Sequence, residues 1–297
     1  MAGLYPDIEP YEHGMLEVGD GQQIYWEACG NPKGRPALVL HGGPGSGCSR
    51  NMRRPFDPDA YRLILFDQRQ CGRSTPDASD PSTDLCVNTT EHLLADIEML
   101  RTHTEVDRWL IFGGSWGCTL GLAYAERYRH LVTALVLSGV TTTRRSEIDW
   151  LYRGVAPLYP EQYARFRAGA RGQDGNIVEA YRHLLEDGDA VTRAQAAKDW
   201  CDWENALLSI DPNTQPPPRR LTPEFQMAFA RIVTQRHPRR DTPRPLITRA
   251  NARDAAIARS APRHLCSPTS AEPTAGASTT PTESLECSIV ENSIRAR

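Results

Sequence analysis

The chain has 297 residues, a mass of 33.1 kDa, a formal net charge of −3 and a pI of about 6.3. This length suffices for one large α/β domain, or for one domain that carries an insertion. The small net charge argues against binding to nucleic acid or to an anionic membrane surface. The start of the chain is polar and no apolar stretch is long enough to span a bilayer, so we expect neither a signal peptide nor a membrane span.

The eight cysteines are scattered, without a CxxC pair and without the spacing of a metal site. This usage is typical of a reduced chain whose thiols are buried. The sequence therefore predicts a cytoplasmic protein with no bound metal, and it leaves the oligomeric state open.

Residues 15–140 alternate between predicted strands and predicted helices. The predicted strands cover residues 15–18, 23–28, 37–40, 62–66, 109–112 and 134–137, and the predicted helices cover 91–102 and 119–128. The later strands are short and continuously apolar, as in a parallel sheet that is covered on both faces. The order indicates a doubly wound α/β sheet. Asn88 is expected to cap the first helix, with Glu91 three residues further on.

Three loops follow predicted strands, at residues 41–46, 67–74 and 113–117. Ligands of open α/β sheets bind at the carboxyl ends of the strands. We therefore expect these loops to converge on one edge of the sheet.

The middle of the chain changes character. Amphipathic helices are predicted at residues 146–152, 177–185, 193–208 and 223–232, with no strand between them. The expected organisation is an α/β core at 1–144 followed by a helical cap at 145–232.

From Val233 to Arg297 the composition changes again. This stretch lacks Trp, Tyr, Phe, Met and Lys, and Gly276 is its only glycine. Arg, Ala, Pro, Ser and Thr dominate, and no periodicity would bury a face. We hypothesise that residues 233–297 are an aberrant tail, either a frameshift product or a disordered extension.

The most specific motif is Gly113-Gly114-Ser115-Trp116-Gly117, between a predicted strand and a predicted helix. A Gly-x-Ser-x-Gly segment in this context is typical of a nucleophile elbow, in which the serine sits exposed on a strained turn. Ser115 is therefore the candidate nucleophile. The alternative is a simple turn before a helix.

The loop His41–Gly45 reads HGGPG and follows another predicted strand. Its glycines permit a close backbone approach, and such a loop can supply an N–H group to an oxyanion hole. The second donor would be the backbone N–H of Trp116. Alone, the motif could be a tight turn that needs glycine for its dihedral angles.

Two further segments carry charged groups. The charged residues of Asp67–Ser74 are expected to form a hydrogen-bond network that organises the loops. This supporting role is favoured over a direct part in catalysis. Glu204 lies beside aromatic residues on a predicted cap helix and could receive a cationic amine, although its spacing also fits an ordinary surface glutamate.

The motifs HGGPG, DQRxxGRS, NTT, GGSWGCTL and WENALLSIDP together resemble the proline iminopeptidase family, over about residues 4–232. The resemblance implies an α/β-hydrolase fold, a mostly parallel sheet with a helical cap. It implies a serine peptidase without cofactor or metal that releases N-terminal proline from peptides. It further implies Ser115 as nucleophile, Gly43 and Trp116 as oxyanion donors, and Glu204 as the group that binds the substrate amine.

The sequence departs from this family in three respects. Gln70 stands where a glycine is common, and Val233 stands where the family has a second amine-binding glutamate. The later motifs that carry the acid and base of the triad do not occur. Asp254 and His264 have the order of a Ser, Asp, His triad, but neither follows a predicted strand.

We therefore expect the C-terminal strands to be missing, the sheet to end at residues 134–137 with an unpaired apolar edge, and Ser115 to lack activation. The predicted function is a prolyl aminopeptidase with impaired catalysis. Two alternatives stay open. One is a non-catalytic, truncated or frameshifted relative that at most binds N-terminal proline peptides. The other is a serine esterase or amidase of the same fold.

Overall fold

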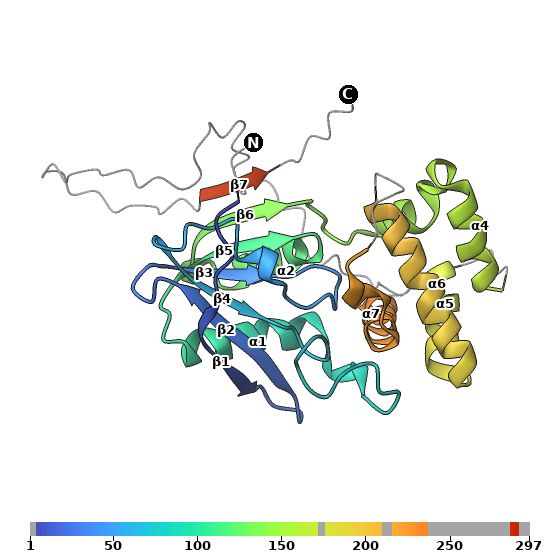
Figure 1. Cartoon of the computed structure of the whole chain (residues 1–297), viewed down its shortest axis with the longest axis horizontal. Helices are drawn as coiled ribbons and strands as arrows, with labels where there is room; N and C mark the ends of the chain where they lie inside the picture. The colour runs from blue at the N-terminus through green and yellow to red at the C-terminus, as the bar shows by residue number, and fades with distance from the viewer. Residues whose placement is uncertain (1–3, 172–175, 210–215, 237–285, 291–297) are drawn as a thin grey trace, which may run out of the picture.

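A seven-stranded sheet forms the centre of the computed structural model, which describes residues 4–171, 176–209, 216–236 and 286–290. The strands lie in the order β1-β2-β4-β3-β5-β6-β7 (Figure 1). Their bounds are β1 (Pro10–Glu17), β2 (Gln23–Gly30), β3 (Arg35–Leu40), β4 (Tyr61–Phe66), β5 (Trp109–Gly114), β6 (Val132–Ser138) and β7 (Glu286–Val290). β2 is antiparallel to both of its neighbours, and the strands from β4 to β7 pair in parallel. The prediction of a mostly parallel α/β sheet is confirmed.

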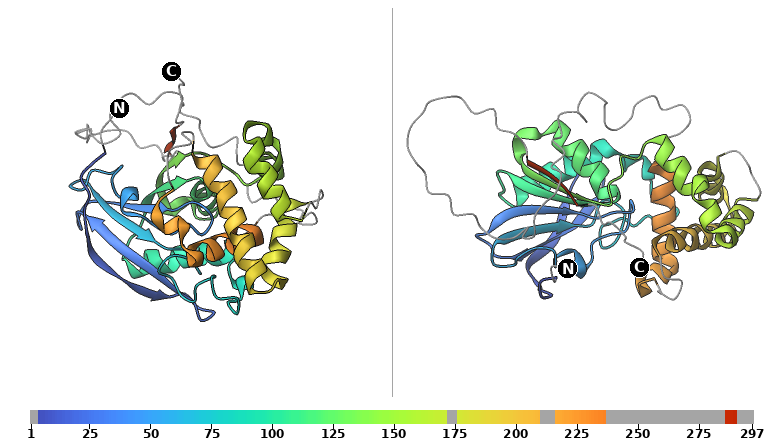
Figure 2. Two further views of the ribbon diagram at one scale, coloured as in Figure 1. Left: turned by 45° about the vertical axis from the view of Figure 1, so that its right-hand side comes forward. Right: turned by 90° about the horizontal axis from the view of Figure 1, so that it is seen from above.

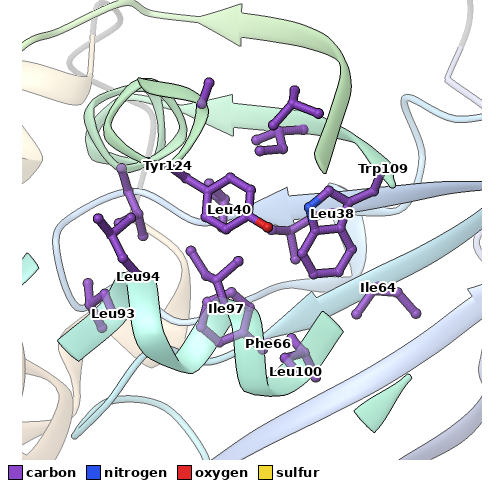
Figure 3. Close-up of a cluster of buried hydrophobic side chains, with 14 of the residues drawn as sticks. Leu38, Leu40, Ile64, Phe66, Leu93, Leu94, Ile97, Leu100, Trp109 and Tyr124 are labelled. Carbon is purple, nitrogen blue, oxygen red and sulfur yellow. The ribbon is translucent and has the colours of Figure 1, made fainter. Parts of the chain in front are cut away.

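The central strands are apolar throughout because both of their faces are buried. Leu38 and Leu40 of β3 belong to one core cluster, whereas Ala37 and Val39 belong to a cluster on the opposite face. The first face is covered by α1 (Thr90–His103) and α2 (Trp116–Arg127), whose side chains meet the sheet around Leu40 (Figure 3).

The N-cap of helix α1 lies one residue later than the sequence pattern predicted. Thr89, not Asn88, is its N-cap, and the Thr89 hydroxyl accepts the backbone N–H of His92. Asn88 instead donates its side-chain amide to the carbonyl oxygen of Arg69 and to the side chain of Gln70. The capping prediction for Asn88 was wrong because a buried loop partner takes up its side chain.

The cap consists of α3 (Arg145–Asp149), a π-helical turn (Trp150–Gly154), α4 (Pro160–Gly169), α5 (Ile177–Asp187), α6 (Ala190–Leu208) and α7 (Pro223–Arg236). Helices α4 to α7 stand together beyond one end of the sheet (Figures 1 and 2). They enclose a second core, in which Phe166 stacks on Tyr181 at 4.7 Å and on Trp203 at 5.3 Å between ring centroids. None of the helices in the described ranges combines the length and the hydropathy that a bilayer crossing requires.

Two elements differ from the expectations at the C-terminal side. Helix α7 continues through Val233 to Arg236, and Val233 is fully buried in the cap core. In addition, β7 pairs in parallel with β6, with Val136 opposite Ser288. The prediction that the sheet ends at β6 was therefore wrong. An apolar edge strand offers unpaired N–H and C=O groups, and a distant segment satisfies them here.

Candidate active site

Ser115 lies at the junction of β5 and α2, in the geometry of a nucleophile elbow. Its backbone dihedrals are φ 53° and ψ −121°, a strained combination for a residue with a side chain, and the residue is exposed. A Cβ atom on Gly113 would lie 2.4 Å from the carbonyl oxygen of Gly117. A Cβ atom on Gly117 would lie 2.3 Å from the carbonyl oxygen of Leu40. The turn therefore requires both glycines of Gly-x-Ser-x-Gly.

The HGGPG loop lies directly against the elbow. An ideal Cβ on Gly42 would be 3.2 Å from the Cβ of Ser115 and 3.7 Å from its hydroxyl oxygen. The next residue, Gly43, has φ 114°, a left-handed conformation that favours glycine. This loop brings backbone close to the serine, as an oxyanion hole requires.

The third loop joins the other two through hydrogen bonds. Gln68, just after β4, bonds to both His41 and Trp116. The predicted convergence of the three loops at the carboxyl edge of the sheet is thereby confirmed.

A buried ionic network supports this third loop. The Asp67 carboxylate, 1% exposed, accepts the backbone N–H of Cys48 and is paired with Arg73 at 2.7 Å. Glu27, also 1% exposed, pairs with Arg73 at 3.0 Å and with Arg53 at 2.8 Å. Burial opposes the charge on Asp67, but the Arg73 guanidinium outweighs it and holds the pKa of Asp67 below its ordinary value. The network fixes the loop, as the sequence suggested.

Gln70 shows how the loop accommodates its departure from the family. Its φ is 66°, in the left-handed region where a glycine would be free of strain. Its side-chain amide donates to the carbonyl oxygen of Asp84 at 2.7 Å and accepts from Asn88 at 3.0 Å. These two bonds hold the strained residue in place.

The candidate acid and base of the triad, Asp254 and His264, lie outside the described residues. Among the residues that the structure does describe, no histidine or carboxylate hydrogen-bonds the Ser115 hydroxyl, and His41 is engaged with Gly42 and Gln68. In the same ranges no group of three His, Cys, Asp or Glu side chains has the arrangement of a metal site.

Glu204 lies on α6 in the cap and is partly buried. The Tyr152 hydroxyl donates to its carboxylate at 2.6 Å. Burial raises the pKa of Glu204, while Tyr152 and the nearby charge of Arg220 oppose that rise. Sequence spacing did not reveal Tyr152 as its partner, because a π-helical turn sets the direction of that side chain.

The cap contacts the core loops through α7 and the segment before it. Arg219 donates to the carbonyl oxygen of Cys48 at 3.2 Å, and a Cβ on Gly45 would meet the Ile232 side chain at 3.1 Å. Arg231, 2% exposed, donates to the carbonyl oxygens of Ala78 and Asp80. Among described residues, Glu204 shares no hydrogen bond with the three loops. Its hydrogen-bond partner, Tyr152, belongs to the cap.

Comparison with known proteins shows which proteins this chain resembles. A family model described as the alpha/beta hydrolase fold matches residues 36–220. A probable proline iminopeptidase of Streptomyces coelicolor is 53% identical over 233 residues, covering 78% of this chain and 72% of that protein. A proline iminopeptidase of Xylella fastidiosa is 45% identical over 234 residues, with coverage of 78% and 73%. The crystal structure of proline iminopeptidase from Mycobacterium smegmatis gives a TM-score of 0.45 at 22% identity, covering 65% of this chain and 68% of that one.

Proposed function

Because the chain belongs to the proline iminopeptidase family of α/β hydrolases, we propose that it acts on peptides that begin with proline, with Ser115 as the nucleophile. The observation that supports this most is the strained, exposed Ser115 between β5 and α2, with the HGGPG loop against it. The Ser115 oxygen would attack the carbonyl carbon of the proline and lose its proton, and the peptide would leave as an amine that takes up a proton; water would then hydrolyse the prolyl ester on Ser115 and release proline.

In this proposal the backbone N–H groups of Gly43 and Trp116 stabilise the negative charge of the tetrahedral intermediate. Trp116 is the first residue of α2, so its N–H also lies at the positive end of a helix. Each such donor is worth about 2.7–4 kcal/mol of transition-state stabilisation in a well-studied serine peptidase.

Glu204 is the proposed site for the cationic amine of the N-terminal proline. A partly buried carboxylate pairs strongly with a cation because little water competes for it. Where the family carries a second amine-binding glutamate, this chain has Val233, which is buried in the cap core. We therefore propose that the amine is held by one carboxylate here.

We further propose that turnover is impaired. Attack by Ser115 requires a base that takes the hydroxyl proton, and none of the described residues is placed to do so. In a well-studied serine peptidase the loss of the histidine alone lowers turnover about a million-fold. The same observation favours the second candidate function, a non-catalytic relative that binds N-terminal proline peptides.

Hydrolysis of proline p-nitroanilide by the full chain and by Ser115→Ala tests this function. The proposal predicts slow release of p-nitroaniline from the proline substrate, slower still from alanine p-nitroanilide, and none above background with Ser115→Ala. Binding of proline amide without any turnover would support the non-catalytic relative. Hydrolysis of a p-nitrophenyl ester without hydrolysis of proline p-nitroanilide would contradict the proposed substrate and favour an esterase.

A further inference from the structure

The hydrogen bonds of Gln68 link the three loops of the site through one buried side chain. Gln68 is the second residue after β4 and is 2% exposed. Its backbone N–H donates to Nε2 of His41 at 3.0 Å, and its side-chain amide donates to the carbonyl oxygen of His41 at 3.1 Å. Its side-chain oxygen accepts the indole N–H of Trp116 at 3.1 Å.

The partners determine how these groups are oriented. A carbonyl oxygen can only accept and an indole N–H can only donate, so the NH₂ group of Gln68 faces His41 and its oxygen faces Trp116. The same reasoning applies to the His41 ring. Its Nδ1 must donate to the carbonyl oxygen of Gly42 at 2.9 Å, because its Nε2 accepts from Gln68. Both ring nitrogens of His41 are therefore engaged by the loops.

The two segments that Gln68 joins are those that carry the proposed oxyanion donors. Gly43 comes two residues after His41, and the other donor is the backbone N–H of Trp116 itself. Oxyanion donors act only when both lie about 2.7–3.1 Å from the position of the developing charge. The separation of these two segments therefore bears directly on the chemistry.

We propose that Gln68 is a positioning residue that sets the separation of the Gly43 and Trp116 backbone N–H groups. This inference rests on the proposed function, which assigns those groups to the oxyanion. Glutamate could still accept from Trp116 but would place a carboxylate oxygen against the carbonyl of His41. Methionine of similar length could make neither side-chain bond. The amide is the group that satisfies both sides of the site.

Gln68→Met tests the proposal, and Gln70→Met is its matched control. Gln70 lies in the same loop and loses two side-chain hydrogen bonds when it is replaced, but they go to Asp84 and Asn88. The first readout is hydrogen exchange of the Trp116 indole N–H by NMR, with its resonance assigned by Trp116→Phe. We expect exchange at least about tenfold faster in Gln68→Met and within about twofold of the original chain in Gln70→Met.

The second readout is affinity for a proline boronic acid. The boron adds the Ser115 hydroxyl oxygen and becomes a tetrahedral anion once the proton leaves to solvent, so this adduct probes the oxyanion donors. Proline amide probes the substrate site without the oxyanion. Gln68→Met should weaken boronate binding about tenfold and amide binding less than about twofold. An equal loss for both ligands, or no loss for either, would overturn the proposal.

Trp116→Phe covers the case in which Gln68→Met does not fold. It removes the Gln68–Trp116 hydrogen bond from the other side and should weaken boronate binding to a similar extent. The double variant should lose little further affinity, because both changes break the same interaction. Additive losses would contradict the proposal. If the unaltered chain binds neither ligand, the proposed function fails, while an indole exchange rate that does not change in Gln68→Met overturns the role of Gln68 separately.

Discussion

Ser115 can adopt its strained conformation only because the residues around it are small. The closest constraint is at Gly117, where a methyl group would lie 2.3 Å from the Leu40 carbonyl, whereas a methyl group on Gly114 would meet nothing within 4 Å. The elbow thus requires glycine at positions 113 and 117, whereas position 114 has room for a side chain.

This contrast predicts different outcomes for two alanine substitutions. Gly117→Ala forces β3 and α2 apart and should cost about 3 kcal/mol of unfolding free energy, because overpacking of this kind cannot relax easily. Gly114→Ala should cost less than about 1 kcal/mol. Urea denaturation of both variants measures the difference. Equal losses would show that the backbone contact at Gly117 does not limit the turn.

Glu204 gives a pH dependence whose sign follows from its environment. Burial raises its pKa, and only the ionised carboxylate pairs with a cationic amine. Affinity for proline amide should therefore be full above this raised pKa and should fall as the pH drops through it. The fall should occur at a higher pH than an exposed glutamate would give.

Titration calorimetry across acidic pH measures this dependence, and Glu204→Gln is the control. That variant should bind more weakly at neutral pH and should show no such fall. A pH profile that is identical in the two proteins would remove Glu204 from the amine site.

At the scale of elements, α7 holds the cap against the core. Arg231 donates to three loop carbonyls, those of Ala78, Asp80 and Thr83, and pairs with Glu186 of α5 at 2.9 Å. One buried guanidinium therefore joins the last cap helix, a second cap helix and the loop after β4.

Arg231→Met should destabilise the protein by about 3 kcal/mol, because it leaves buried carbonyls and a carboxylate without their donor. Arg127→Met is the control, since Arg127 pairs with Glu91 on an exposed surface and should leave the thermal midpoint nearly unchanged. Calorimetric melting of the two variants compares them. A thermal midpoint for Arg231→Met equal to that of the control would contradict the proposal that Arg231 holds the cap against the core.

Sequence patterns predicted the long periodic helices and strands well. They predicted short elements and contacts between distant loops poorly. The first six strands and most helices carry continuous or amphipathic apolar patterns. Helix α4 was missed because Phe166 is its one buried residue. The Gln68 contacts could not be foreseen, since they join residues 27 and 48 positions apart. Such contacts depend on how the strands are ordered, which local patterns do not specify.

At the scale of the whole molecule, the sheet runs from an antiparallel edge at β1 to a parallel edge at β7. Strand β7 brings a segment more than 140 residues away in the sequence beside β6 (Figure 1). A strand of only five residues gives little sequence signal, so its place depends on the edge that it covers.

Ser288→Pro tests this pairing, because proline lacks the N–H group that a ladder uses and is tolerated on an edge strand only where that group would face solvent. Hydrogen exchange of the β6 amides should become faster in this variant and the protein should aggregate more readily. Ser288→Ala keeps the N–H group and should behave as the original chain does. Unchanged exchange in residues 132–138 of Ser288→Pro would show that β7 does not protect the edge.

The central proposal is that Ser115 and Glu204 serve as nucleophile and amine site, and that turnover is impaired because none of the described residues is placed as the base for Ser115. Its most direct test is the turnover number for proline p-nitroanilide, measured beside the Streptomyces coelicolor relative under one set of conditions. The account predicts a turnover number at least about ten-thousand-fold lower than that of the relative, with proline amide still bound. A turnover number within tenfold of the relative, abolished by Ser115→Ala, would contradict it.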